Sequence, residues 1–276
     1  MSQKFFLQSL SVFPASAVTA MDIAEQAGFD GLEMFRFRFL WSYPSLERYR
    51  ENATVRQLEL HLHEALDWNS DVTHPEIRIP ALWGGLLPVD ASLEDQFGDA
   101  TELVVAYGYH WREVVKNRRV HPNWTLQTAT TVPNGNYNCP FEEFIDAVGE
   151  HEISLTLDTQ HLLEYQIGKH GVENLVGVPP AVLMKRLVDF FDKYRHLVRE
   201  IHLNNFSPAR GNRGGRNLWL DDGVLDIREF CQHVQASGWK GSVTPELHPR
   251  FFSRFSTRKN VNVAKRLLEQ VRGYWS

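Results

Sequence analysis

The sequence predicts an α/β fold, a (β/α)8 TIM barrel that residues 1–276 form as a single domain. Eight segments have the alternation or the apolar composition of strands, and most are followed by a segment with helical periodicity. Strands that alternate with helices favour a parallel sheet. A chain of 276 residues, 43% of them hydrophobic, can bury one barrel-sized core. A doubly wound sheet is the alternative, but no G-x-G-x-x-G motif follows the first predicted strand.

The clearest strand lies in residues 153–161, I-S-L-T-L-D-T-Q-H. Apolar and polar residues alternate there, so one face of the strand is apolar and the other is polar. Asp158 stands at the C-terminal end of the run, and His161 follows where the strand is expected to pass into a loop. A carboxylate and an imidazole are typical ligands of divalent metals.

The remaining elements follow in an alternating order. The other predicted strands are Phe5 to Phe13, Gly31 to Phe37, Leu58 to Leu62, Thr101 to Tyr107, Trp124 to Thr130, Arg199 to Asn204 and Ser242 to Leu247. Predicted helices begin at or near Ser16, Ser45, Ser92, Trp111, Pro140, Pro180, Asp226 and Val261, and Gly149 is expected to close the one that starts at Pro140. We expect His74 to Asp90 to form a long loop over the site, in which Trp83 could cover a sugar ring.

Composition excludes several classes of function. The formal charge of −5 and the pI near 6.2 argue against a dedicated binder of nucleic acid or anionic membranes. Cys139 and Cys231 are too few for a disulfide scaffold, which favours a reducing cytoplasm. The apolar run after Lys4 resembles a secretory signal, but polar residues interrupt it, and a first strand is the favoured interpretation. No run reaches the roughly twenty apolar residues that cross a bilayer.

Four polar residues stand at the C-terminal ends of consecutive predicted strands, where barrel enzymes collect their active sites. They are Gln127, Asp158, His202 and Glu246, each on the polar register of its strand. One oxygen or nitrogen donor from each strand would form a mononuclear site for a divalent metal. The alternative is a ring of inward polar groups that satisfy one another and water. For the four together, the metal site is the favoured interpretation.

Short motifs along almost the whole chain resemble the xylose isomerase-like TIM barrel superfamily. They are G-F-D-G-L-E at Gly28 to Glu33, L-D-T-Q-H at Leu157 to His161, I-H-L-N-N at Ile201 to Asn205 and G-S-V-T-P-E-L at Gly241 to Leu247. That superfamily includes sugar isomerases and epimerases, inosose dehydratases and, more distantly, AP endonucleases. The motifs identify the superfamily better than they identify an activity.

The resemblance to the sugar isomerase and epimerase branch implies roles for particular positions. Asp158, His202 and Glu246 match three of the four metal ligands of that branch, and Gln127 stands where the fourth, a glutamate, is expected. His161 matches a histidine that contacts substrate. Arg210 lies near the place of a substrate-binding arginine.

The glutamine at position 127 limits the reaction. In that branch two glutamates act as an acid/base pair on opposite faces of a sugar carbon, and an amide cannot take up a proton at neutral pH. Gln127 could still bind a metal through its carbonyl oxygen. Glu246 would then be the only carboxylate base, which suits a one-base isomerisation or a dehydration and not a two-base epimerisation.

Two inward-facing histidines and one glutamate are further candidates. His61 and His63 share the polar face of the third predicted strand and could contact substrate, or be ordinary core histidines. Glu33 could be a structural partner of a nearby cation. The AP endonuclease branch is disfavoured, because Tyr107, Gln127 and Asn217 stand where its further metal ligands are expected.

The sequence therefore predicts a cytoplasmic, metal-dependent isomerase of carbohydrate metabolism that acts on a small sugar, polyol or hydroxy-carbonyl compound. One divalent ion, Mn²⁺, Mg²⁺ or Zn²⁺, suits the ligand set. Neither a nucleic acid nor a membrane is expected as a partner, and a homo-oligomer stays open. The alternative, suggested by Gln127, is a barrel without catalytic activity that serves as a binding or regulatory protein.

Overall fold

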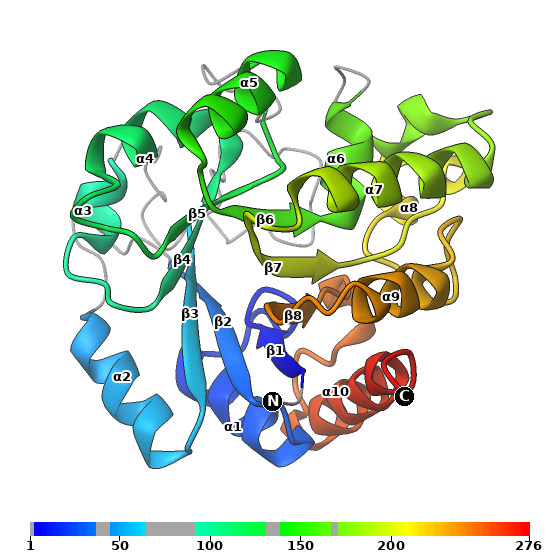
Figure 1. The fold of residues 1–276 in the computed structure, drawn as a ribbon. Coiled ribbons are helices and arrows are strands. Elements are labelled where there is room, and N and C mark those ends of the chain that lie inside the picture. The colour runs from blue at the N-terminus through cyan, green and yellow to red at the C-terminus, as the bar shows by residue number, and fades with distance from the viewer. Residues whose placement is uncertain (1–2, 37–44, 65–91, 131–138, 167–170) are drawn as a thin grey trace.

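The computed structural model describes residues 3–36, 45–64, 92–130, 139–166 and 171–276. Eight strands close into a barrel in which each strand pairs in parallel with the next and β8 pairs with β1 (Figure 1). The predicted (β/α)8 TIM barrel is therefore confirmed. The strands are β1 (Lys4–Gln8), β2 (Gly31–Phe35), β3 (Glu59–His63), β4 (Leu103–Tyr107), β5 (Trp124–Gln127), β6 (Leu155–Asp158), β7 (Val198–Leu203) and β8 (Ser242–Pro245).

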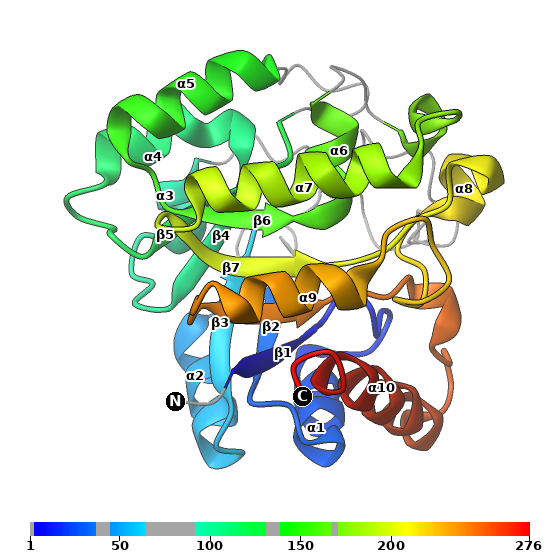
Figure 2. The same ribbon diagram turned by 45° about the vertical axis from the view of Figure 1, so that its right-hand side comes forward.

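Helices surround the ring of strands (Figures 1 and 2). The α-helices are α1 (Ala17–Ala27), α2 (Leu46–Val55), α3 (Leu93–Phe97), α4 (Trp111–Asn117), α5 (Phe141–His151), α6 (Thr159–Tyr165), α7 (Pro180–Tyr194), α8 (Gly211–Gly215), α9 (Ile227–Ala236) and α10 (Thr257–Arg272). Short 3-10 helices are η3 (Gly108–His110), η4 (Val172–Leu175), η5 (Pro208–Arg210) and η6 (Pro249–Phe251). None of the described helices combines the length and the apolar character that crossing a bilayer requires.

The apolar faces of strands and helices form the layer between them. On β6, Leu155 and Leu157 are fully buried, and on α7 the same holds for Leu183 and Leu187. Burying one such side chain contributes about 1.5–3 kcal/mol. Because the apolar residues of each strand face the helices, the polar residues of the same strand face the inside of the barrel.

A polar cluster, the lower cluster, consists of His61, Glu200 and Thr244. It lies inside the barrel toward the N-terminal ends of the strands and packs on an aromatic ring. His61 Nδ1 lies 3.1 Å from Glu200 Oε1, and the hydroxyl of Thr244 donates to the same carboxylate at 2.6 Å. Phe6 stacks on His61 with 3.8 Å between the ring centroids. Gly31 makes room for this stack, since a Cβ there would come within 2.3 Å of the Phe6 ring.

Several element boundaries differ from the sequence-based expectation. The first strand was expected to run to Phe13, but it ends at Gln8, where the backbone enters a turn in which Ser11 N donates to Gln8 O. Gly149 does not close α5, which continues to His151 and ends at Glu152 in the left-handed region with φ 47°. Strand β6 passes directly into helix α6 rather than into a loop. His74 to Asp90, with Trp83, lies outside the described residues.

A buried carboxylate links the C-terminal end of β3 to that of β4. Glu64 accepts a hydrogen bond from Tyr107 N at 2.9 Å and lies 2.7 Å from His110 Nε2, and Glu113 lies 3.4 Å from His110 Nδ1. Burial alone would lower the pKa of His110, but the charges of Glu64 and Glu113 raise it to about 10. His110 is therefore a cation in this link at neutral pH.

We expect the free energy of unfolding to fall as pH rises from the ordinary histidine value toward 10. The folded-state pKa of His110 is raised, so its stabilising contribution is complete below the unfolded-state pKa and disappears as pH passes the folded-state value. The loss is roughly 1.4 kcal/mol per pH unit over that interval. Urea unfolding at several pH values will measure it. The His110→Gln variant should show a flatter profile, and an equally steep profile would contradict the assignment.

Candidate metal centre

Asp158, His202 and Glu246 converge at the C-terminal ends of β6, β7 and β8. One donor atom from each lies within 4.8 Å of the other two, and all three residues are buried. Sheet register explains the convergence, because Asp158 and His202 are direct neighbours across β6 and β7. Glu246 N donates to Leu203 O at 2.9 Å and so continues the β7–β8 ladder. Residues far apart in sequence thus share one small volume.

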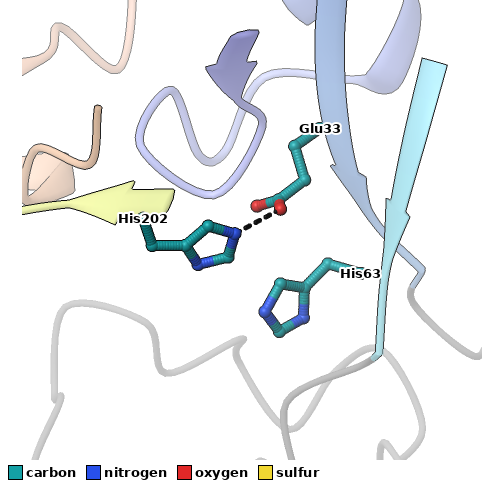
Figure 3. Close-up of side chains that lie close together, drawn as sticks. All are labelled: Glu33, His63 and His202. Atoms are coloured by element: carbon teal, nitrogen blue, oxygen red, sulfur yellow. Dashed lines mark hydrogen bonds and ion pairs between the residues drawn. The ribbon is translucent and has the colours of Figure 1, made fainter. Parts of the chain in front are cut away.

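His202 lies between two carboxylates. Its Nε2 is 2.6 Å from Glu33 Oε2, and its Nδ1 is 2.9 Å from Glu246 Oε1. Figure 3 shows the first of these contacts. Burial lowers the pKa of His202, but the charges of Glu33 and Glu246 raise it well above its ordinary value. A histidine that ligates a metal through one nitrogen commonly donates the other N–H to a carboxylate, and Glu33 is placed to accept it.

Four donors surround the carboxylate of Glu246. Gln8 and His202 contact Oε1, while Asn204 and Asn217 donate to Oε2 at 3.1 and 2.9 Å. Burial alone would raise the pKa of Glu246, but the charge of His202 and the hydrogen bond from it lower the pKa to about 2. Glu246 is therefore held as a carboxylate.

Asp158 has two functions, one for each carboxylate oxygen. Oδ1 accepts from the backbone N–H groups of Gln160 and His161 at 2.9 and 2.8 Å and so caps helix α6. Oδ2 accepts from Gln127 Nε2 at 2.9 Å. The cap fixes the direction of the carboxylate, because Oδ1 is committed to the helix and Oδ2 to the inside of the barrel.

Gln127 contains a buried oxygen without a partner. Its Nε2 lies 3.2 Å from His202 Nδ1 as well as near Asp158, whereas its Oε1 has no hydrogen-bond partner among the described residues. The two ends of an amide are assigned from their surroundings. Turning the amide over would direct Oε1 toward the space between Asp158 and His202. Two carboxylates, one imidazole and one amide oxygen then form a set of donors that fits Mn²⁺, Mg²⁺ or Zn²⁺.

The predicted substrate-binding residues lie at different distances from this centre. His161 Nε2 is 4.0 Å from Asp158 Oδ2. Arg210 is exposed at the end of η5, whereas Arg216, which the sequence-based reasoning did not select, is buried. Arg216 lies 3.4 Å from His161 Nδ1 and forms an ion pair with Glu164 at 2.8 Å. The roles of His161 and Arg210 toward a substrate stay predictions.

His61 and His63 occupy different depths of the barrel. His61 is bound to Glu200 in the lower cluster. His63 stacks on Phe35 with 4.0 Å between the ring centroids, and its ring lies 5.6 Å from that of His202. Burial lowers the pKa of His63 to about 3, so this imidazole is neutral. Of the two, only His63 is next to the metal centre, and a substrate contact by either stays a prediction.

Sequence-based reasoning gave no role at the centre to three residues that donate to Glu246. They are Gln8, Asn204 and Asn217. Glu33, which the sequence suggested as a structural partner of a nearby cation, contacts His202. A signal for Asn204 was present, because it is the last residue of the predicted seventh strand, two positions after His202 and on the same face. Asn217 was named only as a departure from the AP endonuclease pattern, and its loop has no periodicity that would place it beside Glu246.

Comparisons with known proteins agree with the fold. Residues 134–269 match the family model described as a xylose isomerase-like TIM barrel. Together with the closed barrel, this match confirms the resemblance to the xylose isomerase-like TIM barrel superfamily that the motifs indicated. No curated protein matches the sequence.

Solved structures with the same fold differ in what they act on. D-allulose 3-epimerase from Methylomonas sp., solved in complex with D-allulose, is 15% identical, with a TM-score of 0.59 over 99% of this chain and 97% of that one. Endonuclease IV from Thermus thermophilus is 15% identical, with a TM-score of 0.56 over 97% and 99%. A xylose isomerase domain protein from Alicyclobacillus acidocaldarius subsp. acidocaldarius is 17% identical, with a TM-score of 0.55 over 99% of both chains. At these identities the likeness shows the fold alone.

Proposed function

We propose that the protein is a metal-dependent isomerase of a small sugar or a sugar-like hydroxy-carbonyl compound. The observation that carries the proposal is the buried convergence of Asp158, His202 and Glu246, with donor atoms within 4.8 Å of one another. The D-allulose bound to a protein of the same fold supports a small sugar rather than a nucleic acid. The net charge of −5 also supports a small sugar rather than DNA as the substrate, although endonuclease IV has this fold. The two cysteines are buried and form no disulfide, and free thiols are typical of reducing compartments. This supports a place in the cytoplasm.

Asp158, His202, Glu246 and the carbonyl oxygen of Gln127 would hold the ion. A bound divalent ion would polarise the oxygens of the substrate. Glu33 orients His202, and the helix cap orients Asp158. Glu246, held in its ionised form, is the group that takes a proton from one carbon and returns it to the next. Because Gln127 cannot take up a proton, the glutamate pair that two-base epimerisation uses is incomplete, and the centre suits isomerisation better.

The proposal is tested by metal analysis and by a substrate panel. Protein purified with Mn²⁺, Mg²⁺ or Zn²⁺ present should hold about one ion per chain by elemental analysis. Aldose–ketose pairs and hydroxypyruvate-like acids are then incubated in D₂O and followed by NMR. We expect metal-dependent interconversion with deuterium entering at the carbon next to the carbonyl. Stoichiometric metal without any turnover over a broad panel would contradict the isomerase.

A second candidate function is a binding or regulatory barrel without catalysis. The specific observation in its favour is the NH₂ group of Gln127, which donates a hydrogen bond to Asp158 Oδ2 and lies 3.2 Å from His202 Nδ1, where a cation would otherwise be bound. Absence of metal from protein purified under metal-replete conditions would favour this function over the isomerase.

Changing Gln127 to glutamate should increase the affinity for metal and lower the stability of the metal-free protein. The new carboxylate adds a charged ligand, which we expect to tighten binding of Mn²⁺ by about tenfold or more. Without metal it stands beside Asp158 and Glu246 and repels them. Thermal unfolding with and without Mn²⁺ will show a larger metal-dependent rise in Tm than in the wild type. Equal rises in the two proteins would argue that residue 127 does not contact the ion.

A further inference from the structure

His63 carries a buried nitrogen that no described residue satisfies. Its Nδ1 lies 2.9 Å from the carbonyl oxygen of Glu64, which can only accept, so Nδ1 carries the proton. Nε2 therefore presents a lone pair, and it has no hydrogen-bond partner among the described residues. The residue is 1% exposed. A buried lone pair without a donor is costly unless a ligand completes it.

Two other buried ligands face the same space. Glu33, His63 and His202 come from β2, β3 and β7, and a donor atom from each lies within 4.8 Å of the others. In Figure 3 their side chains extend from three strands toward one another. This cluster shares only His202 with the centre formed by Asp158 and Glu246.

His202 can serve either cluster without losing a hydrogen bond to a carboxylate. With the proton on Nε2, the ring donates to Glu33 and turns the Nδ1 lone pair toward Asp158 and Glu246. With the proton on Nδ1, the ring donates to Glu246 and turns the Nε2 lone pair toward Glu33 and His63. One neutral imidazole has one lone pair, so it serves one position at a time.

We propose that Glu33, His63 and His202 form a second divalent-cation position, alternative to the first and selective for Zn²⁺. Two imidazoles and one carboxylate match the ligands that Zn²⁺ takes, whereas the first position is richer in oxygen and suits Mn²⁺ or Mg²⁺. In this position His202 would bind the ion through Nε2, with its ring proton on Nδ1 toward Glu246. The position stands on its own residues and does not depend on isomerase activity.

The His63→Gln variant separates the two positions, because His63 belongs to the second only. Calorimetric titrations of metal-free protein with Zn²⁺ and with Mn²⁺ are compared with the wild type. We expect Zn²⁺ binding to weaken by about tenfold or more, the scale of losing a metal-site partner, with Mn²⁺ binding unchanged. His121→Gln is the control, since His121 is a buried histidine that bonds Glu94 at 2.8 Å, away from the centre. Zn²⁺ affinity equal in both variants would overturn the proposal.

A second arm removes the first position instead. In the double variant Asp158→Asn, Glu246→Gln, asparagine keeps the cap of α6, and circular dichroism checks the fold. This protein should still bind one Zn²⁺ and lose Mn²⁺ binding, and adding His63→Gln should abolish the Zn²⁺ site. Loss of Zn²⁺ binding from the folded double variant would overturn the second position, while retention of Mn²⁺ would instead contradict the first. Two Zn²⁺ ions bound together by the wild type would overturn the sharing of His202.

Discussion

Replacing Arg216 with alanine will lower the free energy of unfolding by about 3–5 kcal/mol, the usual cost of removing one partner of a buried ion pair. Arg216 donates to both carboxylate oxygens of Glu164 at 3.1 and 2.8 Å, and both residues are buried. The truncation leaves the Glu164 charge in the protein interior without its guanidinium. Equilibrium unfolding in urea will measure the change.

A paired variant separates the charge from the packing. The double variant Arg216→Met, Glu164→Gln removes both charges of the pair. In the wild-type structure Gln160 Nε2 donates to Glu164 Oε1 at 2.8 Å, and the side-chain oxygen of the new glutamine can still accept this hydrogen bond. We expect most of the stability to return, because removing both charges leaves no uncompensated ion. If the paired variant is as unstable as Arg216→Ala, the loss comes from packing of the arginine stem and not from the charge.

Replacing Glu246 with glutamine will lower kcat by about 100-fold to 10,000-fold, the usual range for loss of a positioned base. Glutamine has nearly the same shape and keeps one oxygen for a metal, but it cannot take a proton from a substrate carbon. The substrate that responds best in the panel will be used, with kcat and KM measured separately. Because chemistry is lost while binding is kept, kcat should fall much more than KM changes.

The matched control for that substitution is Glu229→Gln, an exposed glutamate in the first turn of α9. It should leave both constants unchanged. If Glu246→Gln keeps the activity of the wild type, Glu246 is not the base, and another group must move the proton.

The sequence predicted the barrel and the convergence of three candidate ligands, because both follow from regular alternation along the chain. Alternation in β6 tells which residues face inward, and the C-terminal end of each strand tells where a site forms, so Asp158, His202 and Glu246 could be found. Alternation does not tell how far along the barrel axis an inward-facing residue lies. His61 and His63 share one face, yet one is bound in the lower cluster and the other lies beside the centre.

Loops and long-range partners could not be predicted in this way. Arg210 and Arg216 lie in one segment after β7, and only the path of its backbone decides that Arg216 is buried against Glu164 while Arg210 is exposed. Glu33 and His202 are 169 positions apart, and their contact depends on closure of the barrel. Neither propensity nor spacing contains that information.

Both ends of the described chain lie away from the mouth of the barrel. The Phe5 ring, at the start of β1, packs edge-on against Trp275 with 5.7 Å between the centroids, and helices α1 and α10 lie side by side there (Figures 1 and 2). The candidate ligands Asp158, His202 and Glu246 stand at the opposite ends of the strands. The edge-on packing of Phe5 against Trp275 therefore lies at the end of the described barrel opposite to the candidate ligands, so a substitution at either ring is remote from them.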